Sequence, residues 1–347
     1  MAGYYFNLPP ITQLTIPQQA AVNETRPIAL SGGPGTGKSV VSLWRHISNY
    51  QQGKNSLLLT YTTTLKEYLK SCCRTQNLNA ARNVGTSYRN RPCQKWSEII
   101  IDEAQDIENS YYDDIKKYGN VSYGADDSQI LYPSHSSTQA DLRNILPSNV
   151  PYVLNKNFRN TQRIMKFARQ AFPDAVIPQN IIDSLSGNVG ELPVLLISNN
   201  SYKQNDAIVQ IINSFRADDH NIAILVPFKK EVSGLGVSNK NNVLYFEDLL
   251  KSKSINYSVY YEDEVRFPNG CEGISNLHLT TFKSAKGLEF DTVIIPNFDL
   301  FSKVCEDSYV NDWQDFYVAC TRARSNLYLI SNDNISNLSS VTDKEIL

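Results

Sequence analysis

One glycine-rich stretch limits what this 347-residue chain can fold into more than any other. From Gly32 to Ser39 it reads Gly-Gly-Pro-Gly-Thr-Gly-Lys-Ser, which matches the pattern G-x-x-x-x-G-K-[ST]. The apolar run 28–30 before it suits a buried strand, and residues 40–50 after it carry apolar side chains at helical spacing. Glycines let the backbone curl round a phosphate, and N–H groups at the start of the helix point at it. The stretch therefore predicts a P-loop that binds a nucleoside triphosphate.

The P-loop pattern also predicts a role for individual side chains. Lys38 is expected to reach the β- and γ-phosphates, and the Ser39 hydroxyl is expected to ligate Mg²⁺. The alternative is a glycine-rich turn without a ligand, and the flanking strand and helix favour the nucleotide site. The candidate nucleotide-binding residues of this loop are Gly32, Gly33, Pro34, Gly35, Thr36, Gly37, Lys38 and Ser39.

An acidic pair follows a second apolar run. Ile-Ile-Ile at 99–101 reads as a buried strand and is followed by Asp102 and Glu103. At the strand's end Asp102 can hold the metal ion that Ser39 ligates, and Glu103 can polarise the attacking water. Acidic residues often end strands, so the pair alone is a weak signal. About sixty residues after a P-loop, it indicates the second half of a Mg²⁺–ATP site.

Composition allows two folded domains and excludes a globally basic protein. Apolar residues make up 41% of the chain and charged residues 20%, while 33 Lys and Arg face 35 Asp and Glu. Any nucleic-acid contact must therefore come from a local groove. The six cysteines contain no C-x-x-C pair, and the N-terminus lacks a basic segment followed by an apolar run, so we expect a cytoplasmic protein. No apolar run approaches the ~20 residues of a membrane span, so no membrane partner is expected.

Strand-like and helix-like segments alternate along the whole chain. This alternation predicts an α/β fold with parallel sheets covered on both faces. A shift in composition at 146–151, which reads Leu-Pro-Ser-Asn-Val-Pro, is interpreted as the domain boundary. The expected division is a first domain over 1–150, a second over 151–335 and a mobile tail over 336–347.

Further motifs resemble those of superfamily 1 helicases of the UvrD/Rep/PcrA type. In chain order the matching segments are 14–19, which resembles the adenine-reading glutamine motif, and 102–106, 157–159, 281–290 and 317–323, which resemble the second, fourth, fifth and sixth motifs. Their order and their spread over nearly the whole chain support the resemblance. It implies two tandem RecA-like P-loop NTPase domains with the ATP site in the cleft between them.

The resemblance assigns roles to residues at matching positions. It implies that Gln18 reads the adenine, that Phe158 stacks on the base, and that Gly287 and Glu289 line the same site. Gln129 is expected to sense the γ-phosphate, and two arginines are expected to act as arginine fingers; a surface salt bridge is the alternative for each arginine. The catalytic candidates are Lys38, Glu103, Gln129, Arg159 and Arg322, the metal candidates are Ser39 and Asp102, and the implied cofactors are ATP and Mg²⁺.

Departures from the family pattern are equally informative. The interval between Ser39 and Asp102 leaves no room for the accessory subdomain that the family commonly inserts there, and 159–281 contains strands that the second core domain itself needs. We therefore expect a minimal motor without either accessory subdomain. The third motif, 125–133, keeps its glutamine but has no strand-stacking tryptophan, and Lys283 replaces the usual histidine of the fifth motif.

Two functions from different classes remain as hypotheses. The first is an ATP-dependent helicase-like motor that binds single-stranded DNA and translocates along it; whether it also unwinds duplex is left open by the sequence. The second is a nucleotide-driven switch within a larger complex, for example with a nuclease in bacterial antiphage defence. A different P-loop class, such as a kinase, is a weaker third. The candidate strand contacts, for which ordinary loop residues are the alternative, are Tyr61, Thr86, Ser87, Tyr88, Thr281 and Lys283.

Overall fold

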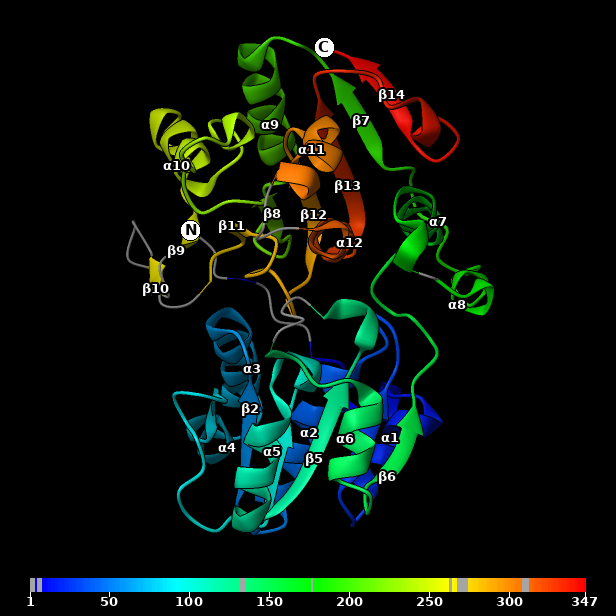
Figure 1. Ribbon diagram of the computed structural model, residues 1–347, viewed down its shortest axis with the longest axis vertical. Coiled ribbons are helices and arrows are strands. Elements are labelled where there is room, and N and C mark those ends of the chain that lie inside the picture. The colour runs from blue at the N-terminus through cyan, green and yellow to red at the C-terminus, as the bar shows by residue number, and fades with distance from the viewer. Residues whose placement is uncertain are drawn as a thin grey trace. The chain divides into compact units, whose positions relative to one another are not determined.

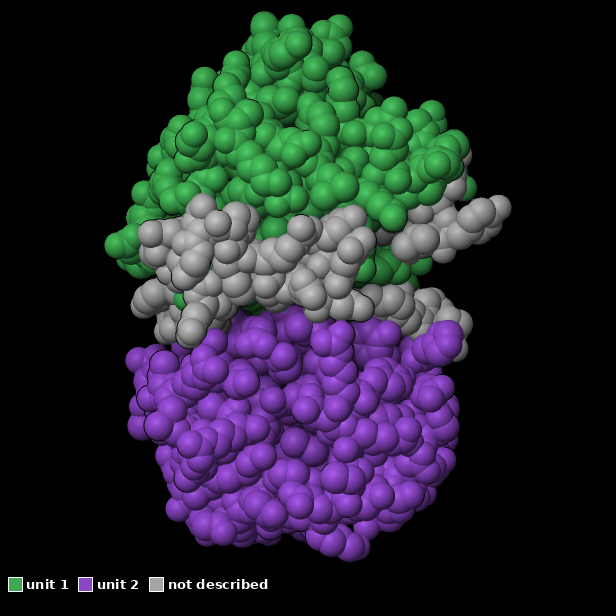
Figure 2. All heavy atoms as spheres, turned by 90° about the vertical axis from the view of Figure 1, so that its left-hand side faces the viewer, with its two compact units in different colours: residues 1–5, 159–347 green, residues 6–158 purple. Residues whose placement is uncertain are grey.

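The computed structural model describes residues 4, 8–130, 135–175, 177–261, 264–266, 274–307 and 312–347. The chain forms two compact units, shown in purple and green in Figure 2. The P-loop unit consists of residues 6–158, and the C-terminal unit consists of residues 1–5 and 159–347. No helix in the described part of the chain is both long enough and apolar enough to cross a membrane.

The P-loop unit is built on a six-stranded sheet in the order β3-β2-β4-β5-β1-β6. All neighbouring strands pair in parallel, so their carboxyl ends meet at one edge of the sheet. The loops that leave this edge carry the glycine-rich loop, the pair Asp102 and Glu103, and Gln129. The strands are β1 (Ile28–Ser31), β2 (Ser56–Thr60), β3 (Val84–Thr86), β4 (Glu98–Ile101), β5 (Asn120–Ala125) and β6 (Val150–Val153).

Helices cover both faces of this sheet. Side chains of β2 and β4 pack in one core with Tyr111, Tyr112 and Leu142 of α5 and α6, which lie on the same face (Figure 1). Leu58 and Ile100, whose side chains point to the opposite face of the sheet, are also buried, as expected for parallel strands between two helical layers. The helices are α1 (Ile16–Asn23), α2 (Lys38–Gln51), α3 (Thr63–Gln76), α4 (Leu78–Arg82), α5 (Asn109–Ile115) and α6 (Gln139–Ile145).

The C-terminal unit contains an eight-stranded sheet in the order β10-β9-β11-β8-β12-β13-β7-β14. Its pairs are parallel except β9–β10, which is antiparallel. The strands are β7 (Val194–Ile197), β8 (Ile222–Val226), β9 (Ser258–Tyr261), β10 (Glu264–Arg266), β11 (Leu277–Thr281), β12 (Phe290–Ile295), β13 (Ala323–Ser331) and β14 (Asp343–Ile346).

Two different cores cover the faces of this second sheet. On one face aliphatic side chains of α9 and α10, such as Ile208 and Leu250, pack against β8 and β11. The other core is aromatic: Phe316 of α12 lies 4.7 Å from Phe282 and 4.9 Å from Phe301, measured between ring centroids. The helices are α7 (Gln162–Ala171), α8 (Gln179–Asp183), α9 (Ser201–Phe215), α10 (Val243–Ser252), α11 (Phe301–Asp307) and α12 (Trp313–Cys320) (Figure 1).

The predicted α/β fold with parallel sheets in two tandem units is confirmed, and the expected boundaries differ in two places. The P-loop unit continues beyond residue 150, because β6 pairs with β1 from Ile28↔Val150 onward and Phe158 N–H donates to Gly35 O at 2.8 Å. In place of the expected mobile tail over 336–347, β14 adds a parallel strand beside β7, and Leu347 N–H donates to Ile197 O at 3.0 Å.

Candidate active site

The P-loop follows β1 and leads into α2, as the sequence predicts. Gly37 is the residue before α2 and has φ 86°, in the left-handed region that favours glycine. A Cβ on Gly37 would meet Gln18 Nε2 at 2.4 Å, and one on Gly32, where φ is 150°, would meet Leu154 O at 2.2 Å. Both positions therefore require glycine for the loop to keep this curl.

Lys38 lies inside the curl of the loop. Its Nζ donates to Gly32 O at 2.6 Å and to Gly33 O at 3.1 Å, and it is 3.5 Å from Asp126 Oδ2. Only 6% of Lys38 is exposed, so these oxygens supply its hydrogen bonds. The ammonium group is thus held where a P-loop receives phosphate oxygens.

Asp102, at the end of β4, lies against the start of α2. The Ser39 hydroxyl hydrogen-bonds its carboxylate, which is 1% exposed, and Oδ2 of Asp102 has no hydrogen-bond partner among the described residues. Burial, reinforced by the charge of Glu103, raises the pKa of Asp102 to about 7. A buried carboxylate oxygen without a donor, next to a hydroxyl, fits the oxygen ligands of Mg²⁺.

No group of three or more His, Cys, Asp or Glu side chains in the described ranges could hold a metal ion by itself. Mg²⁺ usually binds one or two carboxylates together with phosphate oxygens and water. The pair of Ser39 and Asp102 therefore matches a metal that arrives with a nucleotide, and it does not match a structural metal site.

Glu103 has an unusual backbone conformation. Its φ of 55° and ψ of 46° lie in the left-handed region, which is uncommon for a residue with a Cβ and is often found at functional sites. Gln105 Nε2 donates to Glu103 Oε2 at 2.6 Å, and Gln105 Oε1 accepts from the N–H of Asp126 at 3.1 Å. Gln129 Nε2 donates to Asp126 Oδ2. Gln105 and Asp126, which the sequence reasoning did not single out as site residues, thus link Glu103 to Gln129.

The two candidates for adenine recognition are both attached to the P-loop. Gln18 closes a capping box with Thr15 in the first turn of α1, and its Nε2 donates to Thr36 O at 3.0 Å. The N–H of Phe158 donates to Gly35 O, and its ring is 46% exposed with Lys156 Nζ 5.1 Å from the ring centroid. The structure therefore brings an amide and an exposed aromatic ring to neighbouring P-loop carbonyls.

In the C-terminal unit, Glu289 is the centre of an arginine cluster. Arg159 Nε lies 3.0 Å from Glu289 Oε2, and Arg324 Nη1 lies 3.6 Å from Oε1. Burial raises the pKa of Glu289, but the charges of Arg159, Arg324 and Arg322 outweigh it, so the net pKa lies below the ordinary value. Arg324, the second residue of β13, was not among the predicted site residues.

Arg322 directly follows α12 and its Thr321 C-cap. Its Nε donates to Val318 O at 2.9 Å and its Nη1 donates to Leu288 O at 3.3 Å, in the turn that Gly287 makes with φ 81°. Asn160 Nδ2 donates to Thr321 O at 3.0 Å, which joins the segment after Arg159 to the end of α12. Arg159, Glu289 and Arg322, from the fourth, fifth and sixth motifs, therefore lie in one cluster of this unit.

Comparison with known proteins identifies the motifs of this second unit. Residues 258–334 match the family described as UvrD-like helicase C-terminal domain. Over this segment the chain is similar to UvrD-like helicases. It is 27% identical over 253 residues to "Putative ATP-dependent DNA helicase R568" of Acanthamoeba polyphaga mimivirus, a match of 68% of this chain and 34% of that protein. It is 34% identical over 84 residues to RecBCD enzyme subunit RecB of Chlamydia pneumoniae, or 24% of this chain and 8% of RecB.

The chain therefore spans about a third of the length of the mimivirus helicase and less than a tenth of RecB. Among solved structures it is similar to Bacteroides Pif1 bound to ssDNA, with a TM-score of 0.45 at 14% identity, covering 93% of each chain. It is also similar to Pif1 helicase from Candida albicans, with a TM-score of 0.44 at 13% identity, covering 94% of this chain and 98% of the other.

Two of the predicted strand contacts lie together at the carboxyl edge of the first sheet. The rings of Tyr61 and Tyr88, which follow β2 and β3, meet edge to face with centroids 6.0 Å apart, and Tyr88 is 48% exposed. Tyr111, which the sequence reasoning did not select, supports Tyr88 with a centroid distance of 5.8 Å. Thr86 and Ser87 are buried beneath them, so the exposed ring of Tyr88 is the accessible part of this group.

The remaining predicted contacts for single-stranded DNA, Thr281 and Lys283, interact with side chains of their own unit. Thr281 Oγ1 lies 3.0 Å from Ser284 Oγ and the Thr281 side chain is buried in the turn. Lys283 Nζ lies 3.6 Å from Asp315 Oδ2 of α12, whose carboxyl is 1% exposed. Burial raises the pKa of Asp315 to about 7, and Lys283 opposes that rise. Lys283, which is partly exposed, therefore forms an ion pair with a buried carboxylate.

Proposed function

We propose that this chain is an ATP-dependent motor of the superfamily 1 helicase type, which hydrolyses ATP and couples hydrolysis to binding and movement along single-stranded DNA. The observation that carries the proposal is the buried carboxylate of Asp102, which has an unpartnered oxygen beside Ser39 and lies at the end of the P-loop that holds Lys38. The unpartnered oxygen of Asp102 is distinguished by its place beside the Ser39 hydroxyl at the glycine-rich loop, where a metal ion bound with a nucleotide would satisfy it.

The proposed roles in the P-loop unit follow from the contacts of each side chain. The loop N–H groups and Lys38 bind the phosphates, and Lys38 exchanges the carbonyls of Gly32 and Gly33 for phosphate oxygens. Mg²⁺, held by Ser39 and Asp102, would offset the negative charge of the phosphates when bound. Glu103, oriented by Gln105, accepts a proton from the attacking water.

The recognition of the base and the completion of the site are part of the same proposal. Gln18 and Phe158 are proposed to recognise the adenine, because both are fixed to P-loop carbonyls. Arg159 and Arg322 of the C-terminal unit are proposed to stabilise the transferring phosphoryl group, a role worth roughly 10³–10⁵ in rate in related enzymes. Glu289 and main-chain carbonyls hold these two guanidinium groups in the structure.

The proposed strand contact is the exposed ring of Tyr88 with Tyr61 beside it. Stacking on an aromatic ring contributes about 1–3 kcal/mol per base and depends little on sequence, which suits a motor that moves along a strand. Within the described ranges, the intervals between the helicase-like motifs contain elements of the two sheets and their helices and no further subdomain, which favours a motor without accessory subdomains.

A second function is a nucleotide-driven subunit of a larger complex, for example with a nuclease in antiviral defence. One observation favours it specifically: the relative RecB is by name a subunit of the RecBCD enzyme. The near balance of charge over the chain also suits a protein that contributes ATP hydrolysis to an assembly. The two proposals differ in whether a strand alone stimulates hydrolysis.

Steady-state ATP hydrolysis, with and without oligothymidylate, tests the proposal. The motor predicts hydrolysis that is lost in Lys38→Ala and is stimulated by the strand more than about tenfold, which corresponds to about 1.4 kcal/mol of activation free energy. Hydrolysis without stimulation by DNA would support the subunit of a complex in its place. If the wild-type protein hydrolyses no ATP in either condition, both proposals are wrong. A strand-displacement assay on a tailed duplex then tests unwinding.

A further inference from the structure

One segment of the chain carries an excess of positive charge. The whole protein carries a formal net charge of −2, yet residues 66–95 contain seven cationic side chains and a single anionic one, Glu67. This segment begins in α3, includes α4 and β3, and ends before β4. The cations are Lys66, Lys70, Arg74, Arg82, Arg89, Arg91 and Lys95.

Three of these cations line one hollow between α3 and α4. Its volume is about 340 Å³ and it is lined by Lys70, Arg74, Leu78, Ala81 and Arg82. Lys70 and Arg74 are four residues apart, so they extend from the same face of α3. Within the described ranges these three cations form no ion pair, although like charges this close repel one another. An arrangement of this kind is stabilised by an anionic ligand.

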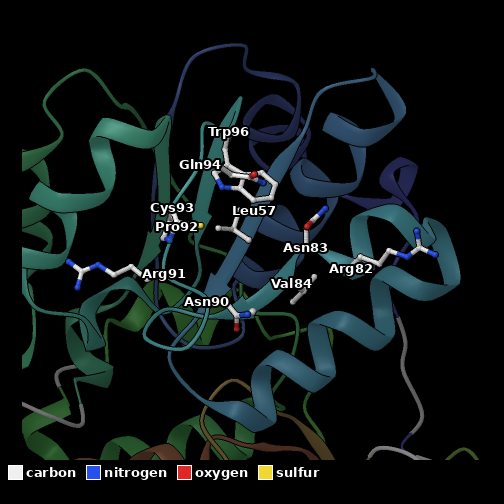
Figure 3. Close-up of a pocket in the computed structure, with 11 residues that line it drawn as sticks. Leu57, Arg82, Asn83, Val84, Asn90, Arg91, Pro92, Cys93, Gln94 and Trp96 are labelled. Atoms are coloured by element: carbon white, nitrogen blue, oxygen red, sulfur yellow. The ribbon is translucent and has the colours of Figure 1, made fainter.

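A second hollow adjoins the first through Arg82. It has a volume of about 260 Å³, and Leu57, Val84 and Trp96 are among its lining residues (Figure 3). The side chains of Arg82 and Arg91 extend away from it on opposite sides (Figure 3). The guanidinium group of Arg91 pairs with Asp114 and lies 5.3 Å from the ring centroid of Tyr111.

The basic segment therefore leads toward the aromatic group at the end of β3. Tyr111, under Arg91, contacts Tyr88, and Tyr88 contacts Tyr61. Cations that continue into exposed aromatic rings are typical of surfaces that bind single-stranded nucleic acid, where the cations bind the backbone and the rings stack on bases. An acidic protein surface would satisfy the cations and leave the exposed ring of Tyr88 without a role.

We propose that Lys70, Arg74 and Arg82 form a phosphate-binding surface for the backbone of a single-stranded nucleic acid that also contacts Tyr88. This inference rests on the strand binding of the proposed function and adds a place where the strand is held outside the helicase motifs. Its contribution is electrostatic and independent of sequence, and it acts whether or not ATP is bound.

The test is the salt dependence of binding, measured by fluorescence anisotropy with labelled oligothymidylate and, separately, oligouridylate. For a single strand, the slope of log K against log salt concentration is about −0.7 per phosphate contact. The variant Lys70→Gln/Arg74→Gln/Arg82→Gln is therefore expected to reduce the steepness of the slope by about 2. The matched control, Lys54→Gln/Lys116→Gln/Lys117→Gln, changes the net charge of the same unit equally at exposed positions before β2 and β5.

The outcomes are distinguishable. A reduced slope in the first variant, with a wild-type slope in the control and unchanged basal ATP hydrolysis in both, supports the surface. An unchanged slope, or equal changes in both variants, overturns it and leaves strand binding by the helicase motifs intact. If the wild-type protein binds neither oligomer at low salt, the inference fails together with the strand-binding part of the proposed function. The comparison of the two oligomers shows whether DNA or RNA is the ligand.

Discussion

Replacing Asp102 with asparagine is expected to stabilise the nucleotide-free protein while removing its activity. The carboxylate is 1% exposed, and Oδ2 has no donor among the described residues. Asparagine has nearly the same shape and no charge to bury. The residue that is proposed to hold Mg²⁺ therefore lowers the free energy of unfolding when the metal is absent, as is common at functional sites.

The size and pH dependence of this effect follow from the pKa of about 7 for Asp102, against 3.8 as its ordinary value. A difference of about three units corresponds to a cost on the order of 4 kcal/mol above pH 7. Because the folded state binds the proton more tightly, this cost is largest above the folded pKa and disappears below the unfolded one. We expect the advantage of Asp102→Asn to shrink by about 2–3 kcal/mol between pH 8 and pH 5.

Urea denaturation at the two pH values, with a chelator and without nucleotide, measures the effect. Trp44 and Trp96 report on the P-loop unit by fluorescence, and Asp113→Asn, at an exposed position paired with Lys116, is the control. The reasoning is refuted if Asp102→Asn is no more stable than wild type at pH 8, or if its advantage is the same at pH 5. Saturating Mg²⁺–ATP should stabilise the wild type and leave the variant nearly unchanged.

Three further changes have expected outcomes. Gly37→Ala forces a Cβ to within 2.4 Å of Gln18 Nε2 at φ 86°, so fluorescent ATP should bind at least about tenfold more weakly, and unchanged affinity would contradict the loop geometry. Lys283→Met leaves Asp315 without its cation, so the free energy of unfolding should fall by about 1–3 kcal/mol. The loss should be larger above pH 7, where the carboxyl of Asp315 is charged, and a loss confined to acid pH would be inconsistent with the ion pair. Tyr88→Ala should weaken binding of oligothymidylate by about 1–3 kcal/mol in anisotropy titrations, and wild-type affinity would exclude stacking at this ring.

The central elements of the fold were predictable because their signals are local. The apolar run before the P-loop, the helix after it and the Ile-Ile-Ile run of β4 each read correctly from the sequence alone. Edge strands were not predictable in this way. β6 contains Pro151, which is tolerated because β1 is its only partner in the sheet, and the same proline suggested a linker. β14 reads Asp-Lys-Glu-Ile and is a strand through its backbone pairing with β7.

The residues of the candidate site likewise fall into those with a local sequence signal and those whose contacts are long-range. The motif residues were selected by contiguous patterns, and the structure places Lys38 and Ser39 at the start of α2 and Asp102 after the end of β4, as those patterns predict. Gln105, Asp126 and Arg324 were missed because their roles depend on contacts between segments that are far apart in sequence. The pairing of Lys283 with Asp315 is of the same kind. Of the third motif, Leu131, Tyr132 and Pro133 lie outside the described residues.

The measurement that tests the central claim most directly is ATP binding and hydrolysis by Glu103→Gln beside the wild type. Glutamine keeps the shape of the side chain and its contact with Gln105 but cannot accept a proton. The account predicts wild-type affinity for Mg²⁺–ATP and a turnover reduced by about 10²–10⁴, the usual contribution of a general base. Turnover within a few-fold of wild type would contradict the assignment of Glu103, and loss of ATP binding would show that the residue supports the structure of the site.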